Sequence, residues 1–465
     1  MQTTKPRKFL TPFLSLAALA AALVLAVPGR AADAAASGGK PAWLTELSLS
    51  AKATYDDNVF GVSGLGMPEL QTWVSTISAR IALDFVPLLG NPGKGALKTF
   101  TFAYQPERVT FQDASSEDYT AHRLNLVLKA KSGDVSFSFD NAFVYIDGNK
   151  AAPIYALNQL AGAAANQFDK FRNNYAHGLA RERRNQEQER YNFALQYSTG
   201  QTFVRAASSL VDFALNTDLH NTGAAPYKGY QNYVDRYDIN GGGDFGYKLT
   251  PDLAVTLGYR AGYQYQQLFA AAITGDRHFS TNHYQRYLAG IEGKLSKTIT
   301  VKLALGPDEH NYNPSTPISH LRTTRFFGEG SLTAALPDNQ SLTFGYRQWV
   351  FVASTGTVPY TDYTYTLAYH WNMTKQWGLD VGGKVLEANY TMGNDAAGSA
   401  PSLRDDIDYG ASFGFTYALN PHFVLSAAYA YDKATNGYDN LPANLFPAYR
   451  NLQHNVFTFG AQFKF

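Results

Sequence analysis

The stretch LAVTLGYRAGYQY, residues 253–265, decides the fold. Apolar or aromatic side chains occupy every second position: Leu253, Val255, Leu257, Tyr259, Ala261, Tyr263 and Tyr265. Thr256, Arg260 and Gln264 lie between them. A period of two places successive side chains on opposite faces of a β-strand. One apolar face and one polar face predict a strand that meets lipid on one side and a wet interior on the other.

The same period recurs along the chain. Residues 121–131 (AHRLNLVLKAK), 407–419 (IDYGASFGFTYAL) and 454–465 (HNVFTFGAQFKF) alternate in the same way. About eighteen such segments occur from residue 44 onward, and an even number is typical of single-chain bacterial barrels. Residues 203–215 (FVRAASSLVDFAL) alternate poorly, so sixteen strands remain an alternative. The expected fold class is all-β, a transmembrane antiparallel up-and-down β-barrel, because lipid tolerates no unpaired strand edge.

The connections alternate between short and long. Tight-turn sequences stand at 132–134, 250–252, 337–339 and 420–422, where Pro, Gly, Asn and Asp favour turns. Long polar stretches lie between them and are expected to face the cell exterior: 56–71, 105–118, 146–189, 216–232, 266–282, 306–321, 390–405 and 432–452. Short periplasmic turns and long external loops are the arrangement of outer-membrane barrels.

The N-terminus has the pattern of an export signal. Lys5, Arg7 and Lys8 precede an apolar run at 9–27, and Ala32-Asp33-Ala34 offers a small-residue cleavage site. A retained anchor helix is the alternative, but no stop-transfer charges follow the run. The expected organisation is a cleaved signal peptide at 1–34, a short periplasmic segment at 35–43 and a transmembrane β-barrel at 44–465 with a long loop at 146–189.

Composition narrows the function classes. The formal net charge is +1, which provides no basic field for nucleic acid, and no nucleic-acid partner is expected. The chain has no cysteine, which removes disulfides, thiolate chemistry and lipid attachment through cysteine. Aromatic residues make up 14% of the chain, with Tyr 31 and Phe 30, as expected for rings gathered at two membrane interfaces.

Two segments resemble known proteins. The last twelve residues, with Phe457, Phe459 and Phe463 in register and Phe465 at the end, resemble the C-terminal signal by which outer-membrane barrels reach their assembly machinery. TYDDNVF at 54–60 resembles the opening of the putative β-barrel porin families of Gram-negative bacteria.

The resemblance implies a Gram-negative outer-membrane protein, exported through the periplasm and in contact with lipid and lipopolysaccharide. It also implies a porin or channel for passive diffusion of small hydrophilic solutes, with no cofactor and no enzymatic activity. A closed barrel with structural or adhesive external loops is the alternative, and a barrel enzyme is a third. Many porins are homotrimers, and the oligomeric state stays open.

If the alternation holds, one set of basic residues lines the pore: Arg80, Arg123, Arg190, Arg236, Arg260, Arg286, Arg325, Arg347 and Lys384. Such a lining would favour anions or sugars. The same alternation turns carboxylates inward: Asp84, Asp140, Asp238, Asp244, Glu292, Glu329, Asp380, Asp406 and Asp408. A salt-bridged wall that stiffens the barrel is therefore an equal alternative.

Loop 146–189 contains enough helix formers for a short helix. If it enters the lumen, it would narrow the pore with charged side chains, and the constriction residues would be Arg172, Arg181, Arg183 and Arg184. The alternative is a surface cap in which Arg183 and Glu187 form an ordinary i,i+4 pair on a solvated helix.

Three other motifs favour structural roles. Gly241, Gly243 and Gly246 match a nucleotide-binding spacing but lie inside an expected strand, where glycine makes room for a neighbouring ring. Two groups of loop oxygens, 56–58 and 405–408, lack a full calcium ligand set. Asp308, Glu309 and His310 lie in an expected loop without a nucleophile at a suitable spacing. No metal and no catalytic residue is predicted.

Overall fold

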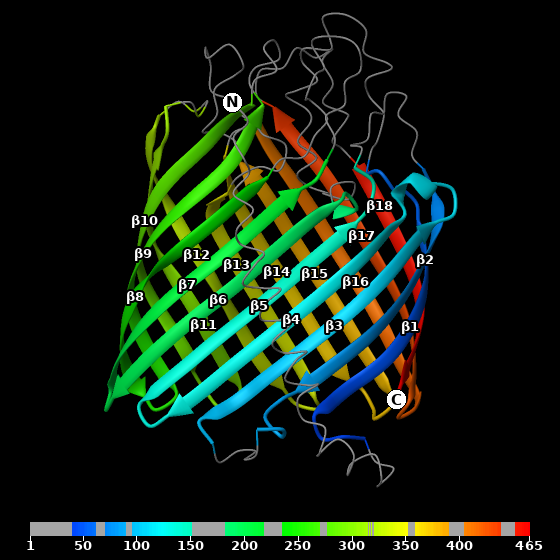
Figure 1. The fold of residues 1–465 in the computed structure, drawn as a ribbon, viewed down its shortest axis with the longest axis horizontal. Coiled ribbons are helices and arrows are strands. Elements are labelled where there is room, and N and C mark those ends of the chain that lie inside the picture. The colour runs from blue at the N-terminus through cyan, green and yellow to red at the C-terminus, as the bar shows by residue number, and fades with distance from the viewer. Residues whose placement is uncertain are drawn as a thin grey trace, which may run out of the picture.

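The computed structural model describes residues 40–61, 70–89, 95–150, 182–217, 235–269, 277–314, 316, 318, 320–351, 359–389, 404–438 and 452–465. These residues form an 18-stranded antiparallel sheet that closes on itself (Figure 1). The strands are β1 (Leu44–Asp56), β2 (Thr72–Asp84), β3 (Leu97–Phe111), β4 (Tyr119–Ser132), β5 (Val135–Asp147), β6 (Gln186–Thr199), β7 (Thr202–Leu215), β8 (Arg236–Thr250), β9 (Leu253–Phe269), β10 (Arg277–Lys294), β11 (Ile299–Tyr312), β12 (Arg322–Leu336), β13 (Gln340–Phe351), β14 (Tyr360–Asn372), β15 (Trp377–Asn389), β16 (Arg404–Asn420), β17 (Phe423–Tyr438) and β18 (Leu452–Lys464). A 3-10 turn, η1 (Ser115–Glu117), follows β3.

The first and last strands close the ring. Each strand pairs with its neighbour in sequence, and β1 pairs with β2 on one side and β18 on the other. The β1–β18 ladder runs from Ser48 opposite Lys464 to Asp56 opposite Val456. No strand edge is therefore left free, which the hydrocarbon interior of a membrane requires. The prediction of eighteen strands is confirmed, and β7 is a full strand despite its irregular alternation.

The two ends of the barrel differ in their connections. Short turns join the strands at one end, except for the longer β2–β3 connection at 85–96. The left-handed backbone of the tight turns is supplied by Asp338 and Asn339, with φ of 57° and 58°, and by Gly133 and Gly200. Two successive positive φ values are the signature of a tight hairpin turn. Most of the longer connections join strand ends at the opposite end, which we call the external end because the sequence predicts that its loops face the cell exterior.

Several strands extend further than the sequence indicated. Residues predicted as external loop at 105–118, 266–282, 306–321 and 432–452 belong partly to strands, since β3 ends at Phe111, β9 at Phe269, β11 at Tyr312 and β17 at Tyr438. Likewise, β6 begins at Gln186, inside the predicted loop 146–189. The reason is physical: backbone pairing continues beyond the apolar band, where both faces are polar and alternation disappears.

The outward face is an apolar band. Ile77 and Leu257 are each 66% exposed, and Phe459 is 57% exposed. Rings gather toward both ends, with Trp377 against Tyr417 near the turns and Tyr237 against Tyr265 near the loops. Apolar side chains that face outward around a closed sheet define a transmembrane β-barrel.

In the part of the chain that the structure describes, no helix has the length and apolar character to cross a membrane. Residues 1–39 lie outside the described residues, so the export signal and its cleavage site stay predictions.

Candidate functional site

The interior of the barrel is hollow. Asn125 lies between Leu124 and Leu126 on β4, which face outward, so it points into the ring, and it is solvent-exposed there. Lys129 on the same strand and Lys52 on β1 are also inward and exposed. A packed barrel interior would bury these side chains. Solvent therefore reaches the inner wall in the middle of the barrel and near the turns.

The residues predicted to line the pore all follow the inward register, and most are paired with acids. Their ion pairs join Arg80 to Glu46 at 3.0 Å, Arg123 to Glu107 at 3.5 Å, Arg260 to Asp244 at 2.7 Å, Arg286 to Asp308 at 3.0 Å, Arg347 to Asp362 at 3.1 Å, and Lys384 to Asp432 at 2.7 Å and Asp408 at 3.3 Å. The inner wall thus carries compensated charges, and a role for these residues in ion selectivity stays a prediction.

Of the other predicted pore residues, Arg190 and Arg236 lie near aromatic rings, and Arg325 stands opposite an acid in its ladder. The Arg190 guanidinium lies 6.0 Å from the Phe213 ring. That of Arg236 lies 4.5 Å from the same ring and 5.5 Å from Phe351. Arg325 stands opposite Asp308 in the β11–β12 ladder. Arg190 and Arg236 are therefore placed for cation–π contact with rings of the inner wall.

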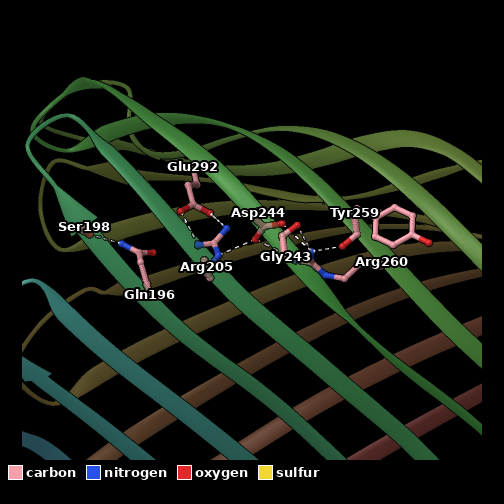
Figure 2. Close-up of polar contacts among 8 residues, drawn as sticks. All are labelled: Gln196, Ser198, Arg205, Gly243, Asp244, Tyr259, Arg260 and Glu292. Carbon is pink, nitrogen blue, oxygen red and sulfur yellow. Dashed lines mark hydrogen bonds and ion pairs between the residues drawn. The ribbon is translucent and has the colours of Figure 1, made fainter.

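Figure 2 shows an ion-pair ladder that crosses four strands. Arg205 on β7 donates from Nε to Asp244 on β8 at 2.8 Å. Its two terminal nitrogens donate to Glu292 on β10 at 2.8 and 3.0 Å. Arg260 on β9 donates to both Asp244 oxygens, at 2.7 and 3.0 Å. Bidentate guanidinium–carboxylate pairs have fixed geometry, so this ladder stiffens the wall between β7 and β10.

Sequence reasoning missed Arg205. The inward positions of β7 include Phe203 and Phe213, both buried. These apolar residues interrupt the alternation of apolar and polar residues that would mark the inward face in the sequence. Gly246 explains how Phe203 fits, because a Cβ at Gly246 would lie 2.0 Å from the Phe203 ring. This is the role expected for a glycine inside a strand. The inward position of Arg205 follows from its place opposite Asp244, which a single sequence does not give.

A buried polar network covers the inner faces of β8 to β11. Asp238 accepts from Gln264 Nε2 at 2.6 Å and from the Tyr284 hydroxyl at 2.5 Å. Asn282 Nδ2 donates to Gln264 Oε1 at 2.8 Å, and Asn282 Oδ1 lies 3.0 Å from His310 Nδ1. All five side chains are buried. Buried polar groups that satisfy one another rigidify the structure around them.

The cluster Asp308, Glu309 and His310 lies in β11 rather than in the predicted loop. His310 Nε2 is 2.9 Å from Asp308 Oδ2, and its other ring nitrogen faces Asn282. Both nitrogens of the imidazole thus meet oxygen atoms of the polar network. The cluster has a structural role in this wall, and the absence of enzymatic activity stays a prediction.

The end of loop 146–189 is anchored at the external rim. Glu117 accepts from Arg183 Nε at 2.7 Å and from Arg184 Nη2 at 2.6 and 2.7 Å. Arg183 also donates to the Val59 carbonyl at 2.8 Å and lies over the Phe111 ring. We call the apolar side chains around it the rim cluster: Val59, Phe60, Val74, Val109, Phe111 and Ala114.

This geometry does not support a lumen constriction made by Arg183 and Arg184. Arg183 and Arg184 are buried in an ion-pair cluster, so neither presents a free charge to the lumen. The predicted Arg183–Glu187 helical pair does not form, because Glu187 lies in strand β6. Arg172 and Arg181 lie outside the described residues, and a constriction built from them stays a prediction.

The first group of candidate cation ligands is already occupied by protein donors. Asp56, Asp57 and His454 offer atoms within 4.8 Å of one another. However, Asp56 Oδ1 accepts from His454 Nε2 and from the Asn58 amide, and Asp57 accepts from the backbone and side-chain amides of Asn455. These bonds tie the external end of β1 to β18. In the second group, Asp408 pairs with Lys384.

Fold and interior together define the class of protein: a closed transmembrane β-barrel with a hollow, ion-paired lumen. No protein-family model matches the chain, and no curated protein matches it as a relative. Among solved structures, OccK3 of Pseudomonas aeruginosa is 11% identical, with 90% of this chain and 95% of that one covered and a TM-score of 0.41. OccAB3 of Acinetobacter baumannii is 10% identical, with coverage of 90% and 99% and a TM-score of 0.40.

A siderophore receptor, PirA of Acinetobacter baumannii, is 9% identical over 92% of this chain and 81% of that one, with a TM-score of 0.40. Scores and identities this low carry no functional conclusion. The class therefore rests on the closure of this chain's own 18 strands.

Proposed function

We propose that this protein is an outer-membrane channel through which small hydrophilic solutes diffuse passively. The observation that carries the proposal is the solvent exposure of inward side chains such as Lys52, Asn125 and Lys129. A polar, wetted lumen inside an apolar outer band provides a water-filled path across a bilayer. No catalytic residue enters the proposal.

The pairing of lumen charges supports neutral, hydroxyl-rich solutes such as sugars over simple anions. An unpaired ring of arginines would attract anions, but here the guanidinium groups of Arg80, Arg260 and Arg347 each have a carboxylate partner. The partly exposed Arg347 guanidinium, which lies over the Trp349 ring, also suits sugar hydroxyls and ring C–H faces. We therefore expect weak ion selectivity.

Location and partners belong to the same proposal. The outward band would contact lipid and lipopolysaccharide after export through the periplasm. Phe465 is 54% exposed and Phe463 also faces outward, so the terminal rings can be read by the barrel assembly machinery without disturbing the fold. The native mass in detergent tests whether the chain forms a homotrimer.

A closed barrel with structural or adhesive loops is the second candidate, and the external rim favours it. The rim cluster and its buried Glu117–Arg183–Arg184 ion pairs fold three external connections together. If this packing seals the lumen, no solute would pass.

Planar-bilayer conductance of the refolded chain without residues 1–34, with liposome swelling in sugars of graded size, tests the proposal. A channel gives discrete current steps and a size-dependent swelling rate. A sealed barrel gives neither, although it still migrates as a folded, heat-modifiable species in gels. Repeating both measurements without residues 151–181 asks whether the long loop restricts the path.

A further inference from the structure

Strand β13 separates from β12 at the external end of the barrel. The β12–β13 ladder runs from Leu336 opposite Gln340 and, among the described residues, ends at Gly328 opposite Gln348. The β13–β14 ladder continues further, to Phe351 opposite Tyr360. The hairpin thus stays intact while its external end leaves the neighbouring strand.

That end reaches strands on another part of the wall. The Val350 carbonyl of β13 accepts a hydrogen bond from Gln264 Nε2 of β9 at 2.9 Å. The Phe351 ring lies 5.5 Å from the Arg236 guanidinium of β8. Strands β9 and β13 are four positions apart in the ring, which is about 19 Å along the wall at the usual strand spacing. The hairpin end must therefore turn into the lumen.

A continuous stack of rings and guanidinium groups accompanies this turn. Arg347 lies over Trp349 at 5.0 Å, Trp349 stacks on Phe351 at 4.8 Å, and Arg236 lies between Phe351 and Phe213. Cation–π contacts gain strength when they are desolvated. Here the contacts run from β13 to β7 across the interior.

Several residues at the external ends of β13 and β14 are buried, whereas Trp349 and Phe351 are partly exposed. Val350, Tyr360 and Asp362 are each at most 2% exposed, although they lie at the solvent end of their strands. Gln264, which holds the Val350 carbonyl, is itself fixed by Asp238 and Asn282 of the buried polar network. The contact is thus built on a rigid base.

We infer that the external ends of β13 and β14, residues 349–351 and 360–362, form the restriction that sets the size limit of the lumen. We call these residues the hairpin ends. Gln264 and Arg236 are their positioning residues. The inference rests on the proposed channel function and goes beyond it, because it assigns the restriction to described strand ends on the β13 side, whereas the sequence pointed to loop 146–189.

Release of the hairpin ends is the first test. The double variant Gln264→Leu with Arg236→Leu removes the hydrogen bond to Val350 and the guanidinium in the stack. Single-channel conductance is expected to rise at least about 1.5-fold, because the narrowest section controls ion flow, and larger sugars should enter liposomes. Asn192→Leu is the matched control, since this inward amide on β6 bonds Asp140 at 3.1 Å and contacts no hairpin residue among the described ones.

A cross-link between β8 and β13 is the second test, because it should restore the restriction. The chain has no cysteine, so Arg236→Cys with Phe351→Cys introduces the sole thiol pair. This variant should show the raised conductance, a cleavable thiol-reactive cross-linker should lower it again, and reduction should restore it. A merely structural defect would not respond to the cross-link and its cleavage. Heat-modifiable gel migration verifies that each variant is folded.

The outcomes separate the two proposals. Wild-type current with unchanged conductance in the folded release variant overturns the inference and leaves the channel function standing. No current in the wild type together with current in the release variant supports the inference and makes the hairpin ends a closure. If neither the wild type nor the release variant carries current, both the channel function and the inference are overturned. A raised conductance that the cross-linker leaves unchanged also counts against the inference.

Discussion

Tyr284 on β10 stands directly opposite Gly262 on β9, and its ring fills the space where a side chain at position 262 would begin. A Cβ at Gly262 would lie 2.1 Å from Tyr284 Cζ. The ring has no easy way to move aside, because its hydroxyl bonds Asp238 at 2.5 Å and the Arg286 guanidinium lies 4.1 Å from its centre. A glycine on one strand thus makes the buried polar network of its neighbours sterically feasible.

Gly262→Ala should therefore destabilise the barrel. Overpacking at a rigid buried site costs about 1–3 kcal/mol, which urea unfolding in liposomes measures as a lower midpoint. Gly383→Ala is the control, because a Cβ there approaches no atom closer than the Gly410 carbonyl oxygen at 4.0 Å. Equal midpoints for the two variants would mean that Tyr284 moves without penalty.

Glu117→Gln should loosen the external rim. It leaves Arg183 and Arg184 buried without a countercharge, and breaking a buried ion pair costs about 3 kcal/mol. We expect faster hydrogen exchange at Val59 and Phe111 and faster proteolysis near residue 183. Glu107→Gln breaks a more exposed pair with Arg123 and should change little. The assignment of the rim cluster fails if Glu117→Gln exchanges like the wild type.

Charge variants should shift ion selectivity in opposite directions. Arg80 and Glu46 pair at 3.0 Å, and both side chains remain partly exposed to the lumen. Glu46→Gln frees a cation and should move the reversal potential in a salt gradient toward anion preference, whereas Arg80→Gln should move it toward cations. The double variant should resemble the wild type. If both single variants moved the reversal potential in the same direction, the charges of Arg80 and Glu46 would not compensate each other in the lumen.

Neighbouring residues on β14 test which face meets lipid. Leu367 faces outward and Ala368 faces the lumen, and both are exposed. Leu367→Arg should cost about 2–4 kcal/mol in a bilayer, because an arginine on the lipid face is poorly solvated. Ala368→Arg should be tolerated, since water reaches it. Similar unfolding midpoints for the two variants in liposomes would rule out the assigned orientation.

The fold could be predicted because one periodicity governs it. Every outward residue in a stretch such as 253–265 meets the same solvent, so apolar and polar positions alternate and fix both strand and face. The alternation fails where inward residues are apolar, as at Phe203 and Phe213 of β7. The alternation also fails beyond the apolar band at the external end, where β9 and β11 continue as polar strands.

The interior was less accessible to prediction. The inward direction of Arg260 or Lys384 follows from period two, but the partner of each follows from register, which a single sequence does not give. Gln264 and Val350 meet across the lumen because a hairpin end turns inward, and no local pattern marks that turn. The sequence offers two places for Arg183, a lumen constriction or a helical pair with Glu187, whereas long-range contact with Glu117 decides its place.

The seam between β1 and β18 governs how such a molecule can be made. Thr54 and Thr458 share a hydrogen bond across 404 positions of chain, so the barrel cannot close until strand β18 has been synthesised. Contacts this distant in sequence form slowly. An unclosed sheet has two exposed strand edges and is prone to aggregate. Biogenesis of this protein would therefore depend on chaperones from synthesis to membrane insertion.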